Sequence, residues 1–148
     1  MNTKKIEATF QLLANSISKI DITNNLFRIS ESDNLRKEFS LKIDNICIEQ
    51  HDTYKSAAMD LSVNVLVSDN NKDKPREFKA LMTINGIFID TTDITDEEFK
   101  QKLNINGSAA LYSIARGCLI NISSQVLEEG KIILPLVNFM EMAKKSKK

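Results

Sequence analysis

Four consecutive stretches of this chain alternate between apolar and polar residues, and no helical pattern separates one stretch from the next. The third stretch is the most regular, with apolar residues at Met59, Leu61, Val63, Val65 and Val67. A period of two places such side chains on one face of a β-strand. Parallel neighbours would need crossover connections of about a dozen residues or more. The pattern therefore predicts that at least the last three strands form an antiparallel meander with one covered face.

The other stretches carry interruptions that predict local irregularities in the strands. The first, Ile6–Ile22, changes phase near Leu12, which predicts a β-bulge there. The second begins near Phe39 and slips in phase near Asn45, and the fourth begins at Phe78. Residues 24–36, between the first and second strands, are polar and irregular, which predicts a crossing loop. We expect the sheet to span residues 6–90.

Helical periodicity begins only after the fourth strand. Apolar residues recur at steps of three and four along residues 107–129, at Leu111, Ile114, Ala115, Cys118, Leu119, Ile122 and Val126. This predicts a long amphipathic helix that ends at Glu128 or Glu129. Gly130 follows, and glycine suits the left-handed position just beyond a helix.

Two capping boxes predict two shorter helices, one before and one after the long helix. Thr95 and Glu98 predict a helix over residues 95–103, followed by a break over residues 103–106. Asn138 and Glu141 predict a final helix over residues 138–147, after a short apolar strand-like run that ends at Pro135. Strands followed by helices indicate an α+β fold, with the helices on one side of the sheet.

Length and charge narrow the class of protein. A chain of 148 residues is long enough for one domain with a real core, and we expect a single domain over residues 1–148. The 20 Lys and Arg residues balance the 20 Asp and Glu residues, so the overall charge favours neither nucleic acid nor an anionic membrane. The basic tail, residues 144–148, is typical of a solvated helix end.

The location of the protein is also constrained by what the sequence contains. No apolar run approaches the roughly 18–20 residues of a membrane helix, and the start of the chain does not resemble a signal peptide. The two cysteines suggest reduced thiols rather than a disulfide framework. We therefore expect a cytoplasmic protein that does not insert into membranes.

Signals for catalysis or metal binding are poor. The single histidine, His51, follows Cys47 by four residues, but the strand-like pattern there favours a loop histidine near a buried cysteine over a metal site or a Cys–His nucleophile pair. The four glycines are scattered, so no phosphate-binding loop can be written. We expect no enzyme activity, no cofactor and no metal. A small-molecule enzyme that depends on His51 or Cys47 remains as a minor alternative.

Apolar residues outside the expected core leave two interpretations open. The crossing loop carries Leu26, Phe27, Ile29 and Leu35, which either fill the core or line an apolar groove. Phe88, just after Gly86, raises the same question. The apolar stripe of the long helix is wide for a helix that covers one sheet, which predicts self-association.

Two segments near the end of the chain form a recognisable combination, the run from Leu111 to Ile120 and the run from Leu134 to Phe139. They resemble the "ARE-C-I" helix and the "L-P-VNF" segment of the SecB export chaperone family. Residues 85–88, Asn-Gly-Ile-Phe, resemble its "GGIF", and residues 9–11 resemble its first strand. The matches keep their order over residues 8–143.

The resemblance implies a four-stranded antiparallel Greek-key sheet with a long helix and a C-terminal helix packed on one side. It implies a homotetramer, a dimer of dimers, with the long helix in the interface through Leu111, Tyr112, Ala115, Cys118, Leu119 and Ile122. It also implies ATP-independent holding of unfolded or pre-secretory polypeptides in apolar grooves, which keeps them competent for translocation. By position, the groove residues would be Leu26, Phe27, Leu35, Ile87, Phe88 and Met140.

Some positions depart from the family pattern and keep alternatives open. The tail is basic where the family is acidic, and the first strand offers Asp21, next to Lys19, where the family has an acidic surface that docks the SecA motor. These departures weaken the expectation of SecA as a partner. The alternatives are a SecB-like chaperone dedicated to one partner, such as an antitoxin, and an adaptor outside protein export.

Overall fold

The structure, a computed structural model, describes residues 8–29, 34–71 and 73–146. Its four strands are β1 (Phe10–Asn24), β2 (Arg36–Gln50), β3 (Lys55–Ser68) and β4 (Glu77–Asp90). They form one sheet in the order β1-β4-β3-β2, and every neighbouring pair is antiparallel. The predicted four-stranded Greek-key sheet is therefore confirmed, with β1 and β2 as its edges.

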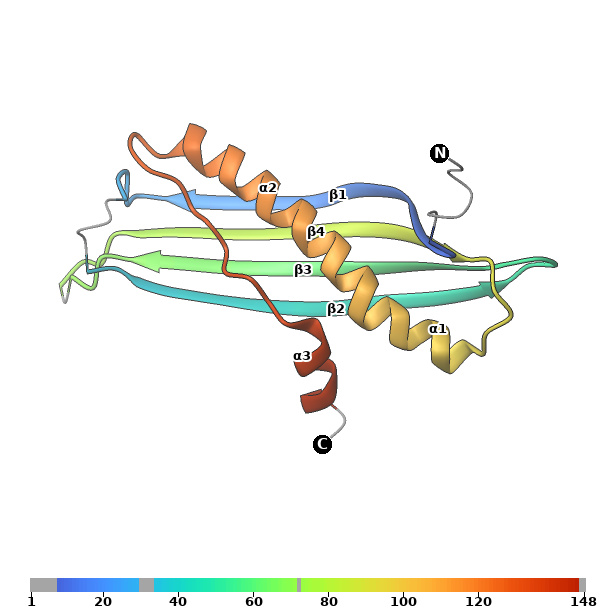
Figure 1. Cartoon of the computed structure of the whole chain (residues 1–148). Coiled ribbons are helices and arrows are strands. Elements are labelled where there is room, and N and C mark those ends of the chain that lie inside the picture. The colour runs from blue at the N-terminus through green and yellow to red at the C-terminus, as the bar shows by residue number, and fades with distance from the viewer. Residues whose placement is uncertain (1–7, 30–33, 72, 147–148) are drawn as a thin grey trace, which may run out of the picture.

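The two faces of the sheet differ sharply in burial. In the central strands β3 and β4, alternate residues such as Met59, Leu61 and Ile84 are fully buried. The intervening residues form an open face that is polar, where Asp60 accepts hydrogen bonds from the side-chain amides of Asn45 and Asn85. Figure 1 shows that the helices all lie on the other side of the sheet. The α+β arrangement with one covered face is as predicted.

The predicted irregularities fall in the edge strands. The register of β1 shifts between Leu12 and Ala14, as expected, and shifts again between Ile17 and Lys19. In β2 the shift lies between Asp44 and Cys47, at Asn45, whose φ is +55°. The strand β1 begins at Phe10, so Ala8 and Thr9 precede it, and Ile6 lies outside the described residues.

The helical part is α1 (Asp96–Lys102), a π-helical turn η2 (Leu103–Gly107), α2 (Ser108–Val126) and α3 (Phe139–Ser146). Thr95 and Glu98 form the predicted capping box at α1. The break expected over residues 103–106 is wrong, because η2 joins α1 to α2 as one helical path. Figure 1 shows this path crossing the sheet diagonally. Within the described residues, no helix is long and apolar enough to cross a membrane.

The end of α2 also differs from the prediction. The helix stops at Val126, before Glu128, and Leu127 is already extended. Gly130 is therefore not the helix cap. Its φ is +91°, and an added Cβ would lie 2.3 Å from the carbonyl oxygen of Ile29, so glycine is needed for a close approach to the crossing loop.

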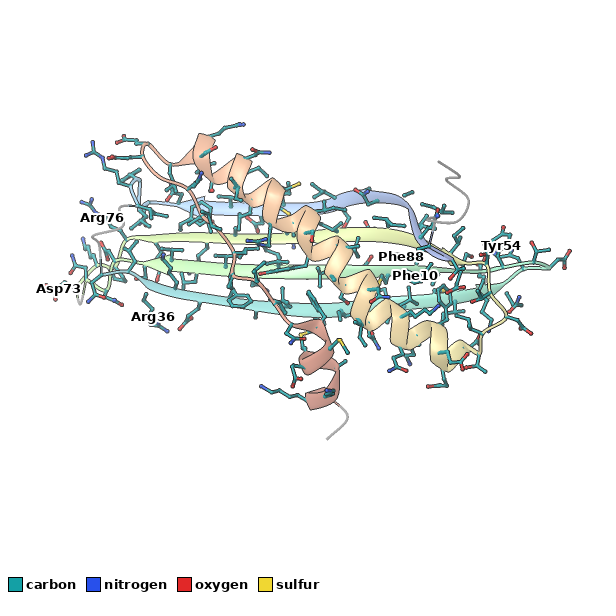
Figure 2. The ribbon with its side chains drawn as sticks, viewed as in Figure 1. Phe10, Arg36, Tyr54, Asp73, Arg76 and Phe88 are labelled. Carbon is teal, nitrogen blue, oxygen red and sulfur yellow. The ribbon has the colours of Figure 1, made fainter. Side chains whose placement is uncertain are left out.

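Aromatic side chains and a close glycine seat the helical layer at one end of the sheet. Phe10 and Phe88 stack with ring centroids 5.3 Å apart, near the end of the sheet that carries Tyr54 (Figure 2). A Cβ at Gly86 would lie 2.8 Å from side-chain atoms of Leu111 and Phe88. The lack of a side chain at Gly86 thus lets α2 pack closely on β4.

A buried carboxylate ties α1 to the same end of the sheet. Asp90 is fully buried, and its carboxylate accepts hydrogen bonds from Lys102 Nζ at 2.7 Å and from the Thr92 backbone N–H at 2.8 Å. Its register partner Lys55 reaches Asp96 at 2.6 Å. Burial by itself raises the pKa of Asp90, but the hydrogen bonds from Lys102 and Thr92 outweigh it and hold that pKa below its usual value.

Replacement of Asp90 should therefore lower stability in a way that depends on pH. A lowered folded-state pKa contributes stability above the unfolded pKa of about 3.9, and this contribution is lost as the pH falls through the folded-state pKa. Asp90→Asn should lower the free energy of unfolding by about 1–3 kcal/mol at pH 7, and by less near pH 2. Urea denaturation at both pH values measures the difference. Asp93→Asn, an exposed neighbour, is the control, and an equal loss at both pH values would contradict the assignment.

Candidate functional site

A wide hollow lies between α3 and the α1–η2 path, beside the edge strand β2. We call it the α3 groove. Its volume is about 750 Å³. Its apolar lining consists of Ile43 and Ile46 from β2, Ile105 from η2, and Met140, Met142 and Ala143 from α3. Polar and charged residues make up the other half of its lining, among them Glu97 and Lys144.

Two further hollows meet the α3 groove at Ile105. One, of about 490 Å³, shares Ile105 and Met140 with the groove and extends to Leu136. The other, of about 390 Å³, shares Ile105 and reaches Ile94 at the start of α1. The π-helical turn η2 places Ile105 at this junction, and such turns are frequent at functional sites. The three hollows thus share Ile105 as a common wall residue.

The lining of the groove suits binding by apolar contact. Methionine side chains are flexible and polarisable, so they adapt to ligands of different shape. Met140 is 57% exposed, although it is a large apolar residue at a helix surface. Beside the groove runs β2, which pairs only with β3 among the described residues. An edge strand with unpaired backbone groups can accept another extended chain.

The residues considered for catalysis lie elsewhere. His51 Nε2 is 2.8 Å from Ser56 Oγ and 3.8 Å from the Glu49 carboxylate, and its ring stacks on Tyr54. Serine and carboxylate thus approach the same ring nitrogen, whereas a catalytic triad needs the carboxylate on the other one. In the described part of the chain, no group of three His, Cys, Asp or Glu residues could hold a metal ion.

Cys47 is exposed, so the expectation of a buried cysteine is wrong. The register shift at Asn45 explains this, because one inserted residue reverses the faces of those that follow. Cys47 pairs with Ala58 on the open face, and Ile48 takes the inward parity opposite Ala57.

The six predicted groove residues do not come together. Met140 lines the α3 groove, whereas Phe27 is exposed in the crossing loop, where its backbone bonds to Glu128 beyond α2. Ile87 is exposed on the open face, and its neighbour Phe88 points to the opposite face and is fully buried. Leu26 is buried as well, and Leu35 packs partly against the core. The interpretation that the loop residues fill the core thus fits Leu26 and Leu35.

The predicted interface residues divide in the same way. Leu111, Tyr112, Ala115 and Leu119 are buried within the chain, where α2 covers its own sheet. Cys118 and Ile122 are half-buried on one flank of α2. On the neighbouring edge strand β1, Ile17 and Ile20 stay exposed although they share the covered side with Ile84 and Met82. Of the six predicted interface residues, Cys118 and Ile122 are the two that stay partly accessible to a second copy.

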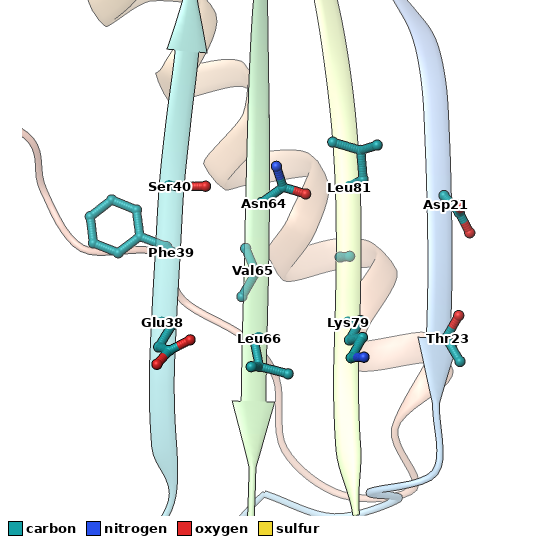
Figure 3. A pocket seen from close by; sticks show the side chains of 11 residues that line it. Asp21, Thr23, Glu38, Phe39, Ser40, Asn64, Val65, Leu66, Lys79 and Leu81 are labelled. Atoms are coloured by element: carbon teal, nitrogen blue, oxygen red, sulfur yellow. The ribbon is translucent and has the colours of Figure 1, made fainter.

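The open face carries its own shallow depression, about 410 Å³ in volume (Figure 3). Asp21 from β1, Glu38 from β2 and Lys79 from β4 lie around it, with Asn64 between them. Lys79 also pairs with Glu77 at 3.2 Å. Apolar residues, among them Phe39, Leu66 and Leu81, line this depression together with the charged residues of both signs.

Sequence reasoning missed five of the six apolar groove residues: Ile43, Ile46, Ile105, Met142 and Ala143. One signal was present, since Met140 and Met142 lie together in the final helix. The three isoleucines could not be found from local pattern, because Ile43 and Ile46 belong to a strand and Ile105 to a segment that was expected to be a break. Their meeting depends on where α3 returns to the sheet.

Comparison with known proteins gives structural neighbours only. No family model and no curated protein matches the chain in sequence. A solved structure of a SecB-like chaperone from Mycobacterium tuberculosis, in complex with a ChAD peptide from the HigA1 antitoxin, superposes with a TM-score of 0.60 and 11% identity. It covers 87% of this chain and 91% of that one. A protein of unknown function from Streptococcus agalactiae gives a TM-score of 0.51 at 12% identity, covering 86% of this chain and 97% of that one.

The first neighbour confirms the predicted resemblance at the level of the fold. The order of strands, the long helix and the C-terminal helix of this chain are those of a SecB-like fold. At this identity the likeness does not carry activity or partners with it.

The different burial of two predicted groove residues can be tested by stability. Phe88→Ala removes a fully buried ring and should cost about 3–5 kcal/mol of unfolding free energy. Phe27→Ala removes a ring that is about half exposed and should cost less than about 1 kcal/mol. Chemical denaturation of both variants measures this, and similar losses would show that Phe27 belongs to the core.

Proposed function

We propose that this protein is an ATP-independent chaperone of SecB type that binds unfolded or pre-secretory polypeptides in the α3 groove. The observation that carries the proposal is this groove, a Met- and Ile-lined surface beside a sheet edge. It joins two further hollows at Ile105, so it has room for an extended segment rather than one small molecule. No nucleotide or cofactor is needed, because binding draws on burial of apolar surface.

Two features of the groove favour clients of varied sequence. Met140 and Met142 can repack around different side chains. The backbone edge of β2 can hydrogen-bond to any extended chain whatever its side chains. We infer that apolar side chains of the client enter between α3 and Ile105 while its backbone lies along β2.

A dedicated partner is the second candidate. The observation in its favour is that the Mycobacterium tuberculosis neighbour is in complex with a peptide from an antitoxin. A single antitoxin-like partner, or a partner of an adaptor outside export, would use the same groove. The two candidates differ in breadth: a general chaperone binds many unfolded proteins, whereas a dedicated one captures a single partner in fixed stoichiometry.

We further propose that two copies pair through their β1 edges, as half of a dimer of dimers. Lys19 and Asp21 both take the parity of the open face, opposite Thr83 and Leu81. If the two β1 strands pair antiparallel about a two-fold axis at Ile20, Lys19 of each copy lies opposite Asp21 of the other copy. The dimer then contains two such pairs. Opposite charges directly across an antiparallel pair are stabilising. The exposed Ile17 and Ile20 would then be covered on the helical side.

Docking to the SecA motor is not part of this proposal. The open face places Lys19 beside Asp21 and Lys79 beside Glu77, so its charges of opposite sign offset each other. The resemblance to the SecB family associates SecA with an acidic surface, and this surface is mixed.

Client binding should depend on Met140 more than on an equally exposed apolar residue outside the groove. Met140→Asp should weaken the affinity for a reduced, carboxymethylated unfolded protein at least tenfold, because a charge enters the apolar lining. Ile133→Asp is the matched control, since Ile133 is 58% exposed and Met140 57%. Fluorescence anisotropy with several unfolded clients, with melting temperatures alongside, measures the effect.

Equal affinities of Met140→Asp and the wild type would reject the groove as the site. Binding of no unfolded client by the wild type, together with capture of one stoichiometric partner from its native host, would favour the dedicated chaperone.

The β1 pairing can be tested by exchanging charges. Lys19→Glu places like charges opposite each other twice and should weaken the dimer several-fold, at about 0.2–1 kcal/mol for each pair. The double variant Lys19→Glu/Asp21→Lys restores both pairs and should recover the dimer. Sedimentation velocity measures the association, with Lys42→Glu on the other edge strand as control. Failure of the double variant to recover would contradict this register.

A further inference from the structure

A segment with no regular secondary structure connects α2 to the wall of the groove. Residues 127–138, here called the strap, run back beside α2 and lead into α3 (Figure 1). At its start the strap is bound to the crossing loop by two backbone hydrogen bonds. The Glu128 N–H donates to the Phe27 carbonyl at 2.8 Å, and the Ile29 N–H donates to the Glu129 carbonyl at 2.9 Å.

The far half of the strap is held by side chains from α2. Ser123 Oγ accepts a hydrogen bond from the Ile132 N–H at 2.7 Å. Arg116 Nε donates to the carbonyl of Leu134 at 3.0 Å, and the Tyr112 hydroxyl donates to the carbonyl of Pro135. These side chains lie toward one side of the helix, so a single helix flank fixes the backbone of the strap at three points.

The last of these contacts also reaches the beginning of α3. Tyr112 is 3% exposed, and its ring meets Phe139, the first residue of α3, edge to face at 5.6 Å between centroids. Burial raises the pKa of the Tyr112 hydroxyl, against the lowering effect of Arg116, so the hydroxyl remains a donor at neutral pH. Tyr112 therefore holds both the end of the strap and the beginning of α3.

Phe139 and, in part, Met142 pack α3 itself against the core. The helix has eight residues, too few to be stable alone in water. Phe139 is buried, but Met140 and Glu141 are exposed and Met142 is half-buried. Asn138 caps its start by accepting from the Glu141 N–H at 3.1 Å. The place of α3 over the groove thus depends on where the strap delivers it.

We propose that Tyr112 and Arg116 are positioning residues for the α3 groove, because their hydrogen bonds to the Pro135 and Leu134 carbonyls hold Met140 opposite Ile105. This inference rests on the proposed function of the groove as a client site. The two residues do not touch the client. They restrict the motion of α3, so that the groove is formed before a client arrives and less ordering is needed on binding.

The expected size of the effect follows from one hydrogen bond. A net loss of about 1 kcal/mol at the end of the strap corresponds to about a fivefold change in the population of displaced α3. Tyr112→Phe keeps the ring against Phe139 and removes only the hydroxyl. Hydrogen exchange in residues 136–146 should become about fivefold faster, while exchange in β3 and β4 stays unchanged.

The same variant should weaken client affinity several-fold only if displacement of α3 reduces the binding-competent population to a minor fraction. The principal readout for the groove is therefore a probe on α3. A fluorophore at Met140→Cys, in a Cys47→Ser/Cys118→Ser background, should report a more solvent-exposed environment in Tyr112→Phe, together with faster dissociation of an unfolded client. Tyr54→Phe, which alters the one other tyrosine, is the matched control.

Variants of Arg116 test the same positioning role independently of Tyr112. Arg116→Met removes the donor, whereas Arg116→Lys retains one, so the lysine variant should recover most of the wild-type exchange rate in residues 136–146. A purely structural role would instead lower the global stability of both variants and accelerate exchange throughout the sheet.

The measurements test the positioning role of Tyr112 and the proposed function of the groove separately. Unchanged exchange of α3 in Tyr112→Phe overturns the inference, as does faster exchange with an unaltered probe signal and unaltered client kinetics. A wild-type protein that binds neither an unfolded client nor a partner overturns the proposed function. In that case the exchange and probe measurements alone decide whether the hydrogen bonds position α3.

Discussion

The structure depends on one constraint, that only one face of its sheet is apolar. Met59, Leu61 and Ile84 on the central strands must be covered, and α2 crosses them diagonally to do so. Because all the helical segments must share that face, the chain has to return over it after α2 ends. The strap is this return path, and the groove is the space left between its final helix, η2 and the edge of the sheet. The candidate site is therefore a consequence of incomplete coverage rather than a pocket built around particular chemical groups.

Much of the fold could be predicted because its signals are local. Alternation marks the strands, the phase changes near Leu12 and Asn45 mark bulges, and Thr95 with Glu98 marks the start of α1. The site could not be predicted in the same way. Ile87 and Phe88 were assigned to one groove, although neighbours in a strand face opposite sides, and the structure places one on the open face and the other in the core. The alternation of side chains along a strand is by itself enough to predict that these two residues face opposite sides.

The remaining differences have a common cause. The end of α2 at Val126, the helical η2 and the role of Gly130 all depend on contacts between distant segments. Gly130 has the backbone conformation that its residue type suggests, but the reason is the carbonyl of Ile29, about a hundred positions away. Tyr112 likewise belongs to the apolar stripe of α2, yet its hydroxyl bonds to the strap. A stripe of residues shows which face of a helix is buried and does not show what covers it.

The way the strap is held has a consequence for how such chains can diverge. The hydrogen bonds that hold the strap to α2 and to the crossing loop are made by the backbone carbonyl and N–H groups of the strap. Every residue except proline has both of these groups. The outward side chains of the strap therefore do not determine the course of its backbone. Leu136 is 84% exposed and Ile133 58%. Lineages could exchange such positions for charged or aromatic residues and acquire a different outer surface over an unchanged scaffold.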